Sequence, residues 1–191
     1  MCSSDLEALA AFDLARNASP DDAIVNHHRG FTLYILGRTA EALASLDRSV
    51  AVAPDRVASH FDRALCLLRL GRWTEGWEEY EWRKRSPLAP GTLPAARPEL
   101  QPGMAIAGKH LLIHAEQGLG DTLQLARYAK VAIRAGARVT LSVPRVMQRI
   151  MRTIDTTLEV TSFPLSVPCD LACATFSMPR VFGLEIGRAH V

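Results

Sequence analysis

Hydrophobic and small residues recur along the first half of the chain with a period of 34 residues. Pro20 and Pro54 are one period apart (54 − 20 = 34), and each precedes a segment with apolar residues at helical spacing. Small residues and large apolar residues keep the same period, namely Ala8, Ala42 and Gly76, and Phe12, Leu46 and Tyr80. The period predicts an array of paired helices over residues 7–86, one second helix followed by two full repeats.

A second helical pattern lies near the end of this array. Trp73, Trp77 and Tyr80 follow i, i+4, i+7 spacing, which places them on one face of a helix. We interpret this stripe as packing between the last repeat and the next domain. A platform for a nucleobase is the alternative.

The pattern changes after residue 86. Five prolines and three glycines between residues 87 and 108 predict an irregular connector. Beyond it, short apolar runs alternate with helical patterns, as in βαβ units with a parallel sheet. Residues 109–184 are therefore expected to form part of a Rossmann-like α/β domain. The expected strands are 109–114, 138–143, 158–161 and 170–174, and the expected helices are 121–135 and 144–154.

The first expected strand leads into the first expected helix through Glu-Gln-Gly-Leu-Gly-Asp at residues 116–121. Glycines permit a positive φ and remove Cβ bulk, so this turn is suited to approach a ligand closely. Leu123 stands where a dinucleotide fingerprint needs its third glycine, and no Gly-Lys-Ser/Thr occurs, so neither a nicotinamide site nor a phosphate loop is expected. From this pattern Asp121 is expected to be the N-cap of a capping box completed by Gln124.

Composition narrows the possible partners. The net charge is only +2, so no nucleic-acid partner is expected. No apolar run is long enough to span a bilayer. Cys169 and Cys173 lack C-x-x-C spacing, so these cysteines and Cys66 are expected to be reduced, buried thiols. His110 and His114 are too far apart along a strand to share a metal ion, and no metal site is expected.

The two ends of the chain share an unusual relationship. Residues 1–6 and 185–190 can be encoded by opposite strands of one DNA segment, which resembles a common sequencing adapter. We therefore expect residues 1–6 and 185–191 to be foreign to the natural protein, and the chain to be a fragment of it.

The helical array resembles tetratricopeptide repeats, with some departures. Asn26 and His60 replace the usual first aromatic residue, and Arg29 and Arg63 stand where leucine is common. The resemblance implies that the repeats bind a protein or peptide partner along their concave face, although inter-helix packing is an alternative role for its residues. The implied groove residues are His27, Phe31, Tyr34 and Phe61.

Three blocks, at residues 71–83, 114–124 and 126–128, together resemble bacterial tetratricopeptide-repeat proteins with a glycosyltransferase-like C-terminal region. Residues 170–173 and 177–183 are similar to a later segment of that family. The resemblance implies that residues 109–184 are the N-terminal part of a GT-B fold, of the type found in heptosyltransferases and O-GlcNAc transferases.

The same resemblance implies a function. Asp121 would take the proton of an acceptor hydroxyl, and Glu116, Gln117, Gly118 and Gly120 would line the acceptor side of the cleft. The parent protein would be a cytoplasmic inverting glycosyltransferase that uses a nucleotide-sugar donor, and this chain, without a cofactor of its own, its acceptor-side half. The competing hypothesis is a non-catalytic scaffold whose repeats bind a partner and whose α/β part is a degenerate remnant.

Overall fold

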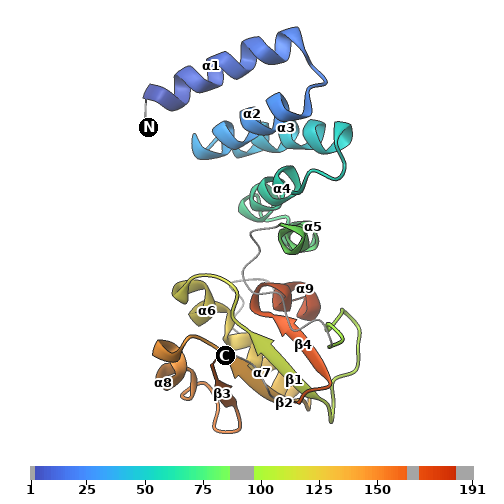
Figure 1. The fold of residues 1–191 in the computed structure, drawn as a ribbon, viewed down its shortest axis with the longest axis vertical. Helices are drawn as coiled ribbons and strands as arrows, with labels where there is room; N and C mark the ends of the chain where they lie inside the picture. The colour runs from blue at the N-terminus through green and yellow to red at the C-terminus, as the bar shows by residue number, and fades with distance from the viewer. Residues whose placement is uncertain (1–2, 87–96, 163–167, 184–191) are drawn as a thin grey trace. The chain divides into compact units, whose positions relative to one another are not determined.

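The computed structural model describes residues 3–86, 97–162 and 168–183, with side chains from Ser4 onward. The chain divides into two compact units, residues 1–89 and 90–191, and each is described by itself. A helical array is followed by a small α/β domain with a parallel sheet, as the sequence predicts (Figure 1).

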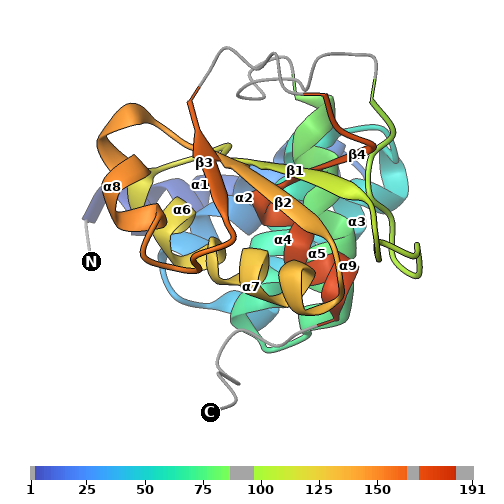
Figure 2. The same cartoon turned by 90° about the horizontal axis from the view of Figure 1, so that it is seen from below.

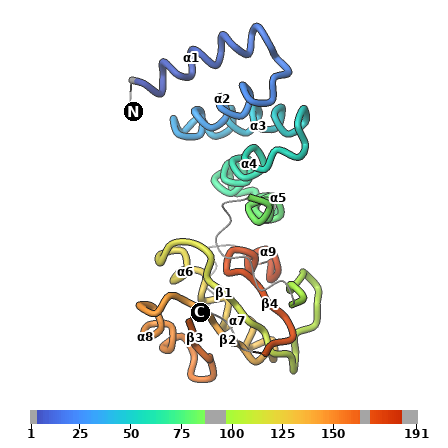
Figure 3. Tube along the Cα trace, viewed as in Figure 1, coloured from blue at the N-terminus to red at the C-terminus, as the bar shows by residue number. Residues whose placement is uncertain are grey.

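The first unit is a succession of helices joined by short turns (Figure 3). Equivalent helices start 34 residues apart, at 23 and 57 and again at 39 and 73. Gly37 and Gly71 follow two of these helices with φ of 79° and 77°, a conformation that favours glycine. The helices are α1 (Ser3–Ala18), α2 (Ala23–Ile35), α3 (Thr39–Val52), α4 (Val57–Arg69), α5 (Trp73–Tyr80) and the 3₁₀ helix η1 (Glu81–Arg85).

Close approach of paired helices explains the recurrent small residues. A Cβ atom on Gly30 of α2 would lie 2.6 Å from Leu46 Cγ and 3.2 Å from the Ala42 carbonyl oxygen of α3. Likewise, a Cβ atom on Gly76 of α5 would lie 2.7 Å from Leu68 Cδ2 of α4. The two helices of a repeat can therefore meet only where one of them has no side chain.

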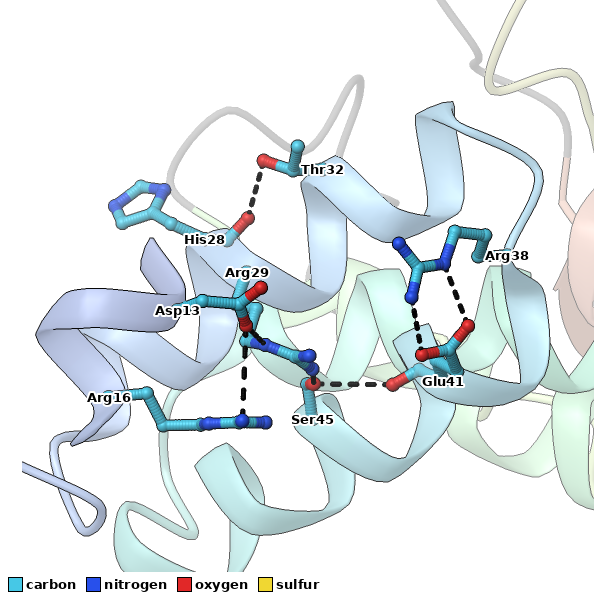
Figure 4. Close-up of polar contacts among 8 residues, drawn as sticks. All are labelled: Asp13, Arg16, His28, Arg29, Thr32, Arg38, Glu41 and Ser45. Carbon is cyan, nitrogen blue, oxygen red and sulfur yellow. Dashed lines mark hydrogen bonds and ion pairs between the residues drawn. The ribbon is translucent and has the colours of Figure 1, made fainter. Parts of the chain in front are cut away.

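An arginine, buried at Arg29 and half-buried at Arg63, links each full repeat to the helix before it, and Figure 4 shows the contacts of Arg29. Arg29 of α2 donates from Nε to Asp13 Oδ1 of α1 at 2.7 Å and from Nη1 to Ser45 Oγ of α3 at 2.5 Å. One period later, Arg63 Nε lies 2.6 Å from Asp47 Oδ1. At both positions, the arginine that stands in place of leucine thus forms an ion pair with the preceding helix.

Asn26 and His60, the other departures from the repeat pattern, also share one role. The Asn26 side-chain amide donates to the Pro20 carbonyl oxygen at 2.8 Å, and His60 Nε2 donates to the Pro54 carbonyl oxygen at 2.7 Å. Each side chain therefore binds the turn that precedes its own helix.

The second unit contains four parallel strands in the order β3-β2-β1-β4. They are β1 (His110–His114), β2 (Arg138–Ser142), β3 (Glu159–Thr161) and β4 (Leu171–Ala174), each within the range predicted from the sequence. The expected helix 121–135 forms as two, α6 (Leu119–Leu125) and α7 (Arg127–Arg134). The expected helix 144–154 is shorter and consists of the 3₁₀ helix η2 (Arg145–Met147) followed by α8 (Gln148–Met151). After β4 come the 3₁₀ helix η3 (Thr175–Ser177) and α9 (Met178–Phe182).

One face of the sheet carries the core of this unit. Leu111, Ile113, Val139 and Leu141 point to that face and are at most 1% exposed. Helices α7 and α9 lie over it (Figure 2). Tyr128 of α7 and Met178 of α9 are buried in the same core and complete the packing.

Part of the predicted connector belongs to the sheet domain. The Leu100 amide donates to the Ala172 carbonyl oxygen at 2.8 Å, and the Ala172 amide donates to the Pro98 carbonyl oxygen at 3.0 Å. Leu100 and Ile106 are buried in the core. Residues 97–108 are irregular but not a free linker, because their apolar side chains pack beside β4. Residues 87–96 lie outside the described residues.

Candidate functional site

The strand order identifies one edge of the sheet as a place where a ligand can bind. From β1 the chain proceeds to β2 and β3 on one side, whereas β4 pairs with β1 on the other side. The order of the strands therefore reverses at β1, because the chain crosses from β3 at one edge to β4 on the other side of β1, and open α/β sheets bind ligands at the carboxyl ends of the strands where the order reverses. His114 ends β1 and is paired in register with Ala174, which ends β4.

The predicted turn lies at this switch point. Glu116 follows β1, and its Oε1 accepts a hydrogen bond from the Phe176 amide, which follows β4, at 3.2 Å. The Glu116 carboxylate therefore joins the two loops. Gln117, Gly118, Gly120 and Asp121 are exposed beyond it. The structure thus brings the five predicted site residues together at one edge of the sheet.

The capping box predicted for Asp121 is wrong. Helix α6 begins at Leu119, so its N-cap is Gly118 and Asp121 lies in the first turn. The helix has no side-chain cap. Instead, the Thr122 amide and Thr122 Oγ1 both donate to the Gly118 carbonyl oxygen at 3.0 Å. Thr122, one residue after the predicted cap, thus supplies the contacts that start the helix.

The predicted role of the glycines also needs correction. Gly118 has φ −59°, and neither it nor Gly120 is among the glycines with positive φ. What Gly118 provides is space, because a Cβ atom there would lie 3.2 Å from Asp121 Oδ2. A Cβ atom on Gly120 would meet nothing within 4 Å, so this part of the turn faces open space.

Two hydroxyl groups that the sequence analysis missed lie at the same edge. Ser142 ends β2, Thr175 follows β4, and both residues are 0% exposed. Within the described parts of the chain, neither Ser142 Oγ nor Thr175 Oγ1 has a hydrogen-bond partner. A buried polar group without a partner is costly and often marks a site for water or a ligand. Their position at the ends of expected parallel strands was the available signal.

The remaining candidate chemistry in this unit is limited. His110 Nε2 lies 2.8 Å from Thr140 Oγ1, and His110 begins β1, at the opposite end of that strand from the turn. Among the residues that the structure describes, no cluster of histidine, cysteine and carboxylate side chains could hold a metal ion. Cys66, Cys169 and Cys173 are free thiols, as expected, but only Cys66 and Cys173 are buried, whereas Cys169 is half-buried. Burial raises the pKa of the Cys66 thiol to about 12, so it is not a reactive thiolate.

The predicted groove residues are not equally accessible. Phe31 is 44% exposed, but Tyr34 lies under the guanidinium of Arg69, 5.1 Å from its ring centroid, and Phe61 packs on Tyr80 at 5.3 Å. His27 is buried, with Nδ1 3.3 Å from Ser59 Oγ and 3.7 Å from Asp62 Oδ2. His27 therefore belongs to the packing between α2 and α4 rather than to an open groove.

Trp77 and Tyr80 of the aromatic stripe pack within the helical unit, on α4, and packing of the stripe on the following domain stays a prediction. Trp77 and Tyr80 are 5% and 4% exposed, and their rings meet edge to face with centroids 5.7 Å apart. Buried in this way against α4, Trp77 and Tyr80 offer no open ring face on which a nucleobase could stack.

Comparison with known proteins gives a limited result. No protein-family model matches the chain, and no curated protein matches it. Among solved structures, the chain is similar to a mutant O-GlcNAc transferase from Thermobaculum terrenum, with 14% identity and a TM-score of 0.37. The similarity covers 86% of this chain and 39% of that protein, so the chain spans about two fifths of its length. No described helix has the length and apolar character that a membrane crossing requires.

Proposed function

We propose that this chain combines a partner-binding helical array with the acceptor-side half of a glycosyltransferase that uses a nucleotide sugar. Two independent features support the proposal. The sequence around residues 114–128 resembles the glycosyltransferase-like family, and those residues lie at the switch point of the sheet, where ligands of α/β domains bind. The position of the turn at that edge is the observation that carries the proposal.

In the proposed reaction, Asp121 is the general base. Its carboxylate accepts the proton of the acceptor hydroxyl while that oxygen bonds to the anomeric carbon of the donor sugar, and the bond from that carbon to the nucleotide diphosphate breaks. Glu116, Gln117, Gly118 and Gly120 form the acceptor side of the site. The open space beside Gly120 leaves room for a sugar ring.

The two buried hydroxyls would reach a sugar acceptor only if this edge of the sheet opened, because both residues are 0% exposed. Ser142 Oγ and Thr175 Oγ1 can each donate one hydrogen bond and accept others, and sugars present hydroxyl groups that do the same. The donor nucleotide would bind mainly to a separate domain, as the family resemblance implies, because residues 116–121 carry no cationic side chain to balance its diphosphate.

The test is a transfer assay on a natural protein in which this chain continues into a donor-binding domain. Asp121→Asn should lower turnover by roughly 10²–10⁴-fold and leave the free energy of unfolding within about 1 kcal/mol, because Asp121 is exposed and is not the helix cap. Asp155→Asn, on an exposed turn of the same unit, is the matched control and should keep native turnover. Native turnover of the Asp121→Asn protein would exclude Asp121 as the base. Absence of any such domain in the natural protein would favour the scaffold hypothesis.

The proposed partner site of the array is the surface around Phe31, the one exposed member of the four groove residues. An exposed aromatic ring on a helix face is a common anchor for a bound peptide. If the α/β part proves inactive while the repeats capture a peptide through Phe31, the chain is a scaffold.

A further inference from the structure

One stretch of the sheet unit is strongly basic although the whole chain is nearly neutral. Residues 122–154 contain seven lysine and arginine residues and no aspartate or glutamate. The net charge of the whole chain is only +2, so the remaining residues together are net negative. The positive charge of the protein is therefore concentrated on α7, β2 and the segment η2–α8.

Most of these cations have no partner of opposite charge. Among the described residues, five of them are exposed and form no ion pair, namely Lys130, Arg134, Arg145, Arg149 and Arg152. Exposed arginines of the helical unit differ, because Arg38 pairs with Glu41 and Arg72 pairs with Glu75. Like charges that are left unpaired on one surface repel one another, and they attract an anionic partner.

The acidic residue that follows this stretch does not neutralise it. Asp155 accepts hydrogen bonds from the amide and the hydroxyl of Thr157 at 2.9 and 2.7 Å. These bonds, and to a smaller extent the charges of Lys130 and Arg134, lower the pKa of Asp155. The cations of α7 are therefore near the turn that follows α8, and one carboxylate faces an excess of positive charge there.

The same surface carries exposed apolar side chains. Met147 and Met151 are 5% and 0% exposed, so they define the inner side of η2–α8. Val146 and Ile150 are 76% and 49% exposed, and each directly follows an arginine in the sequence. Val146 is the most exposed large hydrophobic side chain among the described residues. We call the five unpaired cations together with Val146 and Ile150 the basic surface.

The basic surface belongs mainly to one edge of the sheet. Helix α8 lies beside β3, and β3 and β4 are at opposite ends of the strand order (Figure 2). The last described helix, α9, follows β4, so η2–α8 is at the edge away from the end of the described chain. The basic surface shares no residue with the turn at residues 116–121 or with the surface around Phe31.

Unpaired cations beside exposed apolar side chains match the surface of an anionic lipid bilayer. Anionic headgroups attract lysine and arginine, and apolar side chains next to them enter the boundary between headgroups and acyl chains. A nucleic acid would also attract the cations. However, Tyr128, the only aromatic residue of the stretch, is 2% exposed, so the stretch offers no ring on which a base could stack.

We propose that the basic surface binds anionic lipid headgroups and attaches the sheet unit to the face of a membrane. Arg145, Arg149 and Arg152 contact the headgroup phosphates, and Val146 and Ile150 insert between the headgroups. Lys130 and Arg134 add to the attraction from α7. This attachment does not depend on the proposed transfer reaction, because no residue of the proposed sugar site takes part in it.

The test is co-sedimentation of the whole chain with vesicles of phosphatidylcholine, either alone or mixed with an equal part of phosphatidylglycerol. The chain should bind the mixed vesicles and not the neutral ones, and added salt should weaken binding because it screens exposed charges. Arg145→Gln, Arg149→Gln and Arg152→Gln together should lower the partition coefficient at least about tenfold. All three side chains are exposed, so this variant should keep the native circular dichroism spectrum.

A matched control separates the basic surface from the net charge of the chain. Arg38→Gln, Arg48→Gln and Arg72→Gln together remove the same charge from exposed positions of the helical unit, where ion pairs contribute little to stability. This variant should keep the partition coefficient within about twofold of the native value, because its cations lie outside the basic surface. An equal loss in the two triple variants would overturn the proposal.

A second pair of variants tests insertion into the bilayer and leaves every charge in place. Val146→Ser with Ile150→Ser should weaken binding at least about fivefold, because both apolar side chains then stay in water. Leu14→Ser, at a side chain that is 72% exposed on α1, should bind as the native chain does. Native binding by the Val146→Ser, Ile150→Ser protein, or no binding of the native chain to the mixed vesicles, would overturn the proposal. So would tighter binding to polyglutamate or to single-stranded DNA than to the mixed vesicles, because the occupant would then be an acidic polypeptide or a nucleic acid.

Discussion

The contact between His27 and Asp62 predicts two opposite pH dependences within one protein. Burial, with smaller contributions from Arg56 and His28, lowers the pKa of His27 from 6.5 to about 4. Burial raises the pKa of Asp62 from 3.8 to about 6. Asp62 is therefore ionised only above about pH 6, whereas His27 is protonated only below about pH 4. Although the two side chains lie 3.7 Å apart, no pH exists at which both are mainly charged.

The sign of each effect on stability follows from linkage. The folded state holds His27 neutral while the unfolded state protonates it below pH 6.5, so His27 destabilises the fold as pH falls from 6.5 to 4. Asp62 acts in reverse, because the folded state takes up a proton near pH 6 that the unfolded state does not take up until about pH 3.8. In the native protein the two effects oppose each other.

The magnitude can be worked out for a change from pH 7 to pH 5. At 1.36 kcal/mol per pKa unit, His27 lowers the free energy of unfolding by about 2 kcal/mol, and Asp62 raises it by about 1 kcal/mol. Both figures are upper bounds, because the side chains keep 9% and 14% of their exposure and water screens part of the effect. The native protein should therefore lose less than about 1 kcal/mol over this range.

Single substitutions should separate the two slopes. In Asp62→Asn only His27 remains, so stability should fall by about 1–2 kcal/mol between pH 7 and pH 5. In His27→Gln only Asp62 remains, so stability should rise by up to about 1 kcal/mol. The double variant should show neither slope, which controls for the other titrating groups. If the free energy of unfolding changed with pH in the same direction in both single variants, the opposite pKa shifts of His27 and Asp62 would be refuted.

Urea unfolding followed by tryptophan fluorescence is the suitable assay. The three tryptophans, Trp73, Trp77 and Trp82, all lie in the helical unit, so their emission reports the unfolding of that unit alone. A probe of the whole chain would mix two transitions, and a single free energy would then be undefined.

Three further predictions test the packing and the fragment hypothesis. Gly30→Ala should destabilise the helical unit by about 1–3 kcal/mol in the same urea assay, because the new methyl group meets Leu46, whereas Gly120→Ala, in open space, should cost nothing by circular dichroism. Leu100→Ala should destabilise the sheet unit by roughly 2–5 kcal/mol in thermal unfolding, whereas Leu123→Ala, at a side chain that is 48% exposed, should change its stability by less than about 1 kcal/mol. An equal loss of stability in the two variants would mean that residues 97–108 are a linker and not part of the core. Calorimetry with UDP-, GDP- and ADP-sugars should show no binding tighter than millimolar, and a micromolar signal would mean that this chain holds a complete donor site.

Local patterns were sufficient to predict most elements of the fold. The strands were found because each is a short apolar run bounded by turn residues, and the helical array because its packing contacts repeat every 34 residues. The break at Ala126 within the expected helix 121–135 was missed, because the apolar pattern continues across it. The packing of Leu100 beside β4 was missed because it depends on backbone hydrogen bonds to Ala172, a residue 72 positions away.

The candidate site was predicted only in part, because one part of it has a local sequence pattern and the other depends on strand pairing. The turn at residues 116–121 has a local signature, whereas Thr175 joins it only through the pairing of β4 with β1, which sequence spacing does not specify. The N-cap was misplaced by three residues, because both Gly118 and Asp121 are good cap residues and only the backbone decides between them.

The exposure of Asp121 bears on how such a base could work. A carboxylate in water takes a proton from water as readily as from an acceptor hydroxyl, and its charge is screened. A glycosyl-transfer site must exclude water, because water competes with the acceptor for the anomeric carbon. Residues 117–121 are exposed in this chain, so its own side chains do not exclude water from the turn. If Asp121 is the base, turnover therefore requires a second surface that closes over the turn, and separate addition of a donor-binding domain should restore activity only under conditions in which the two pieces associate.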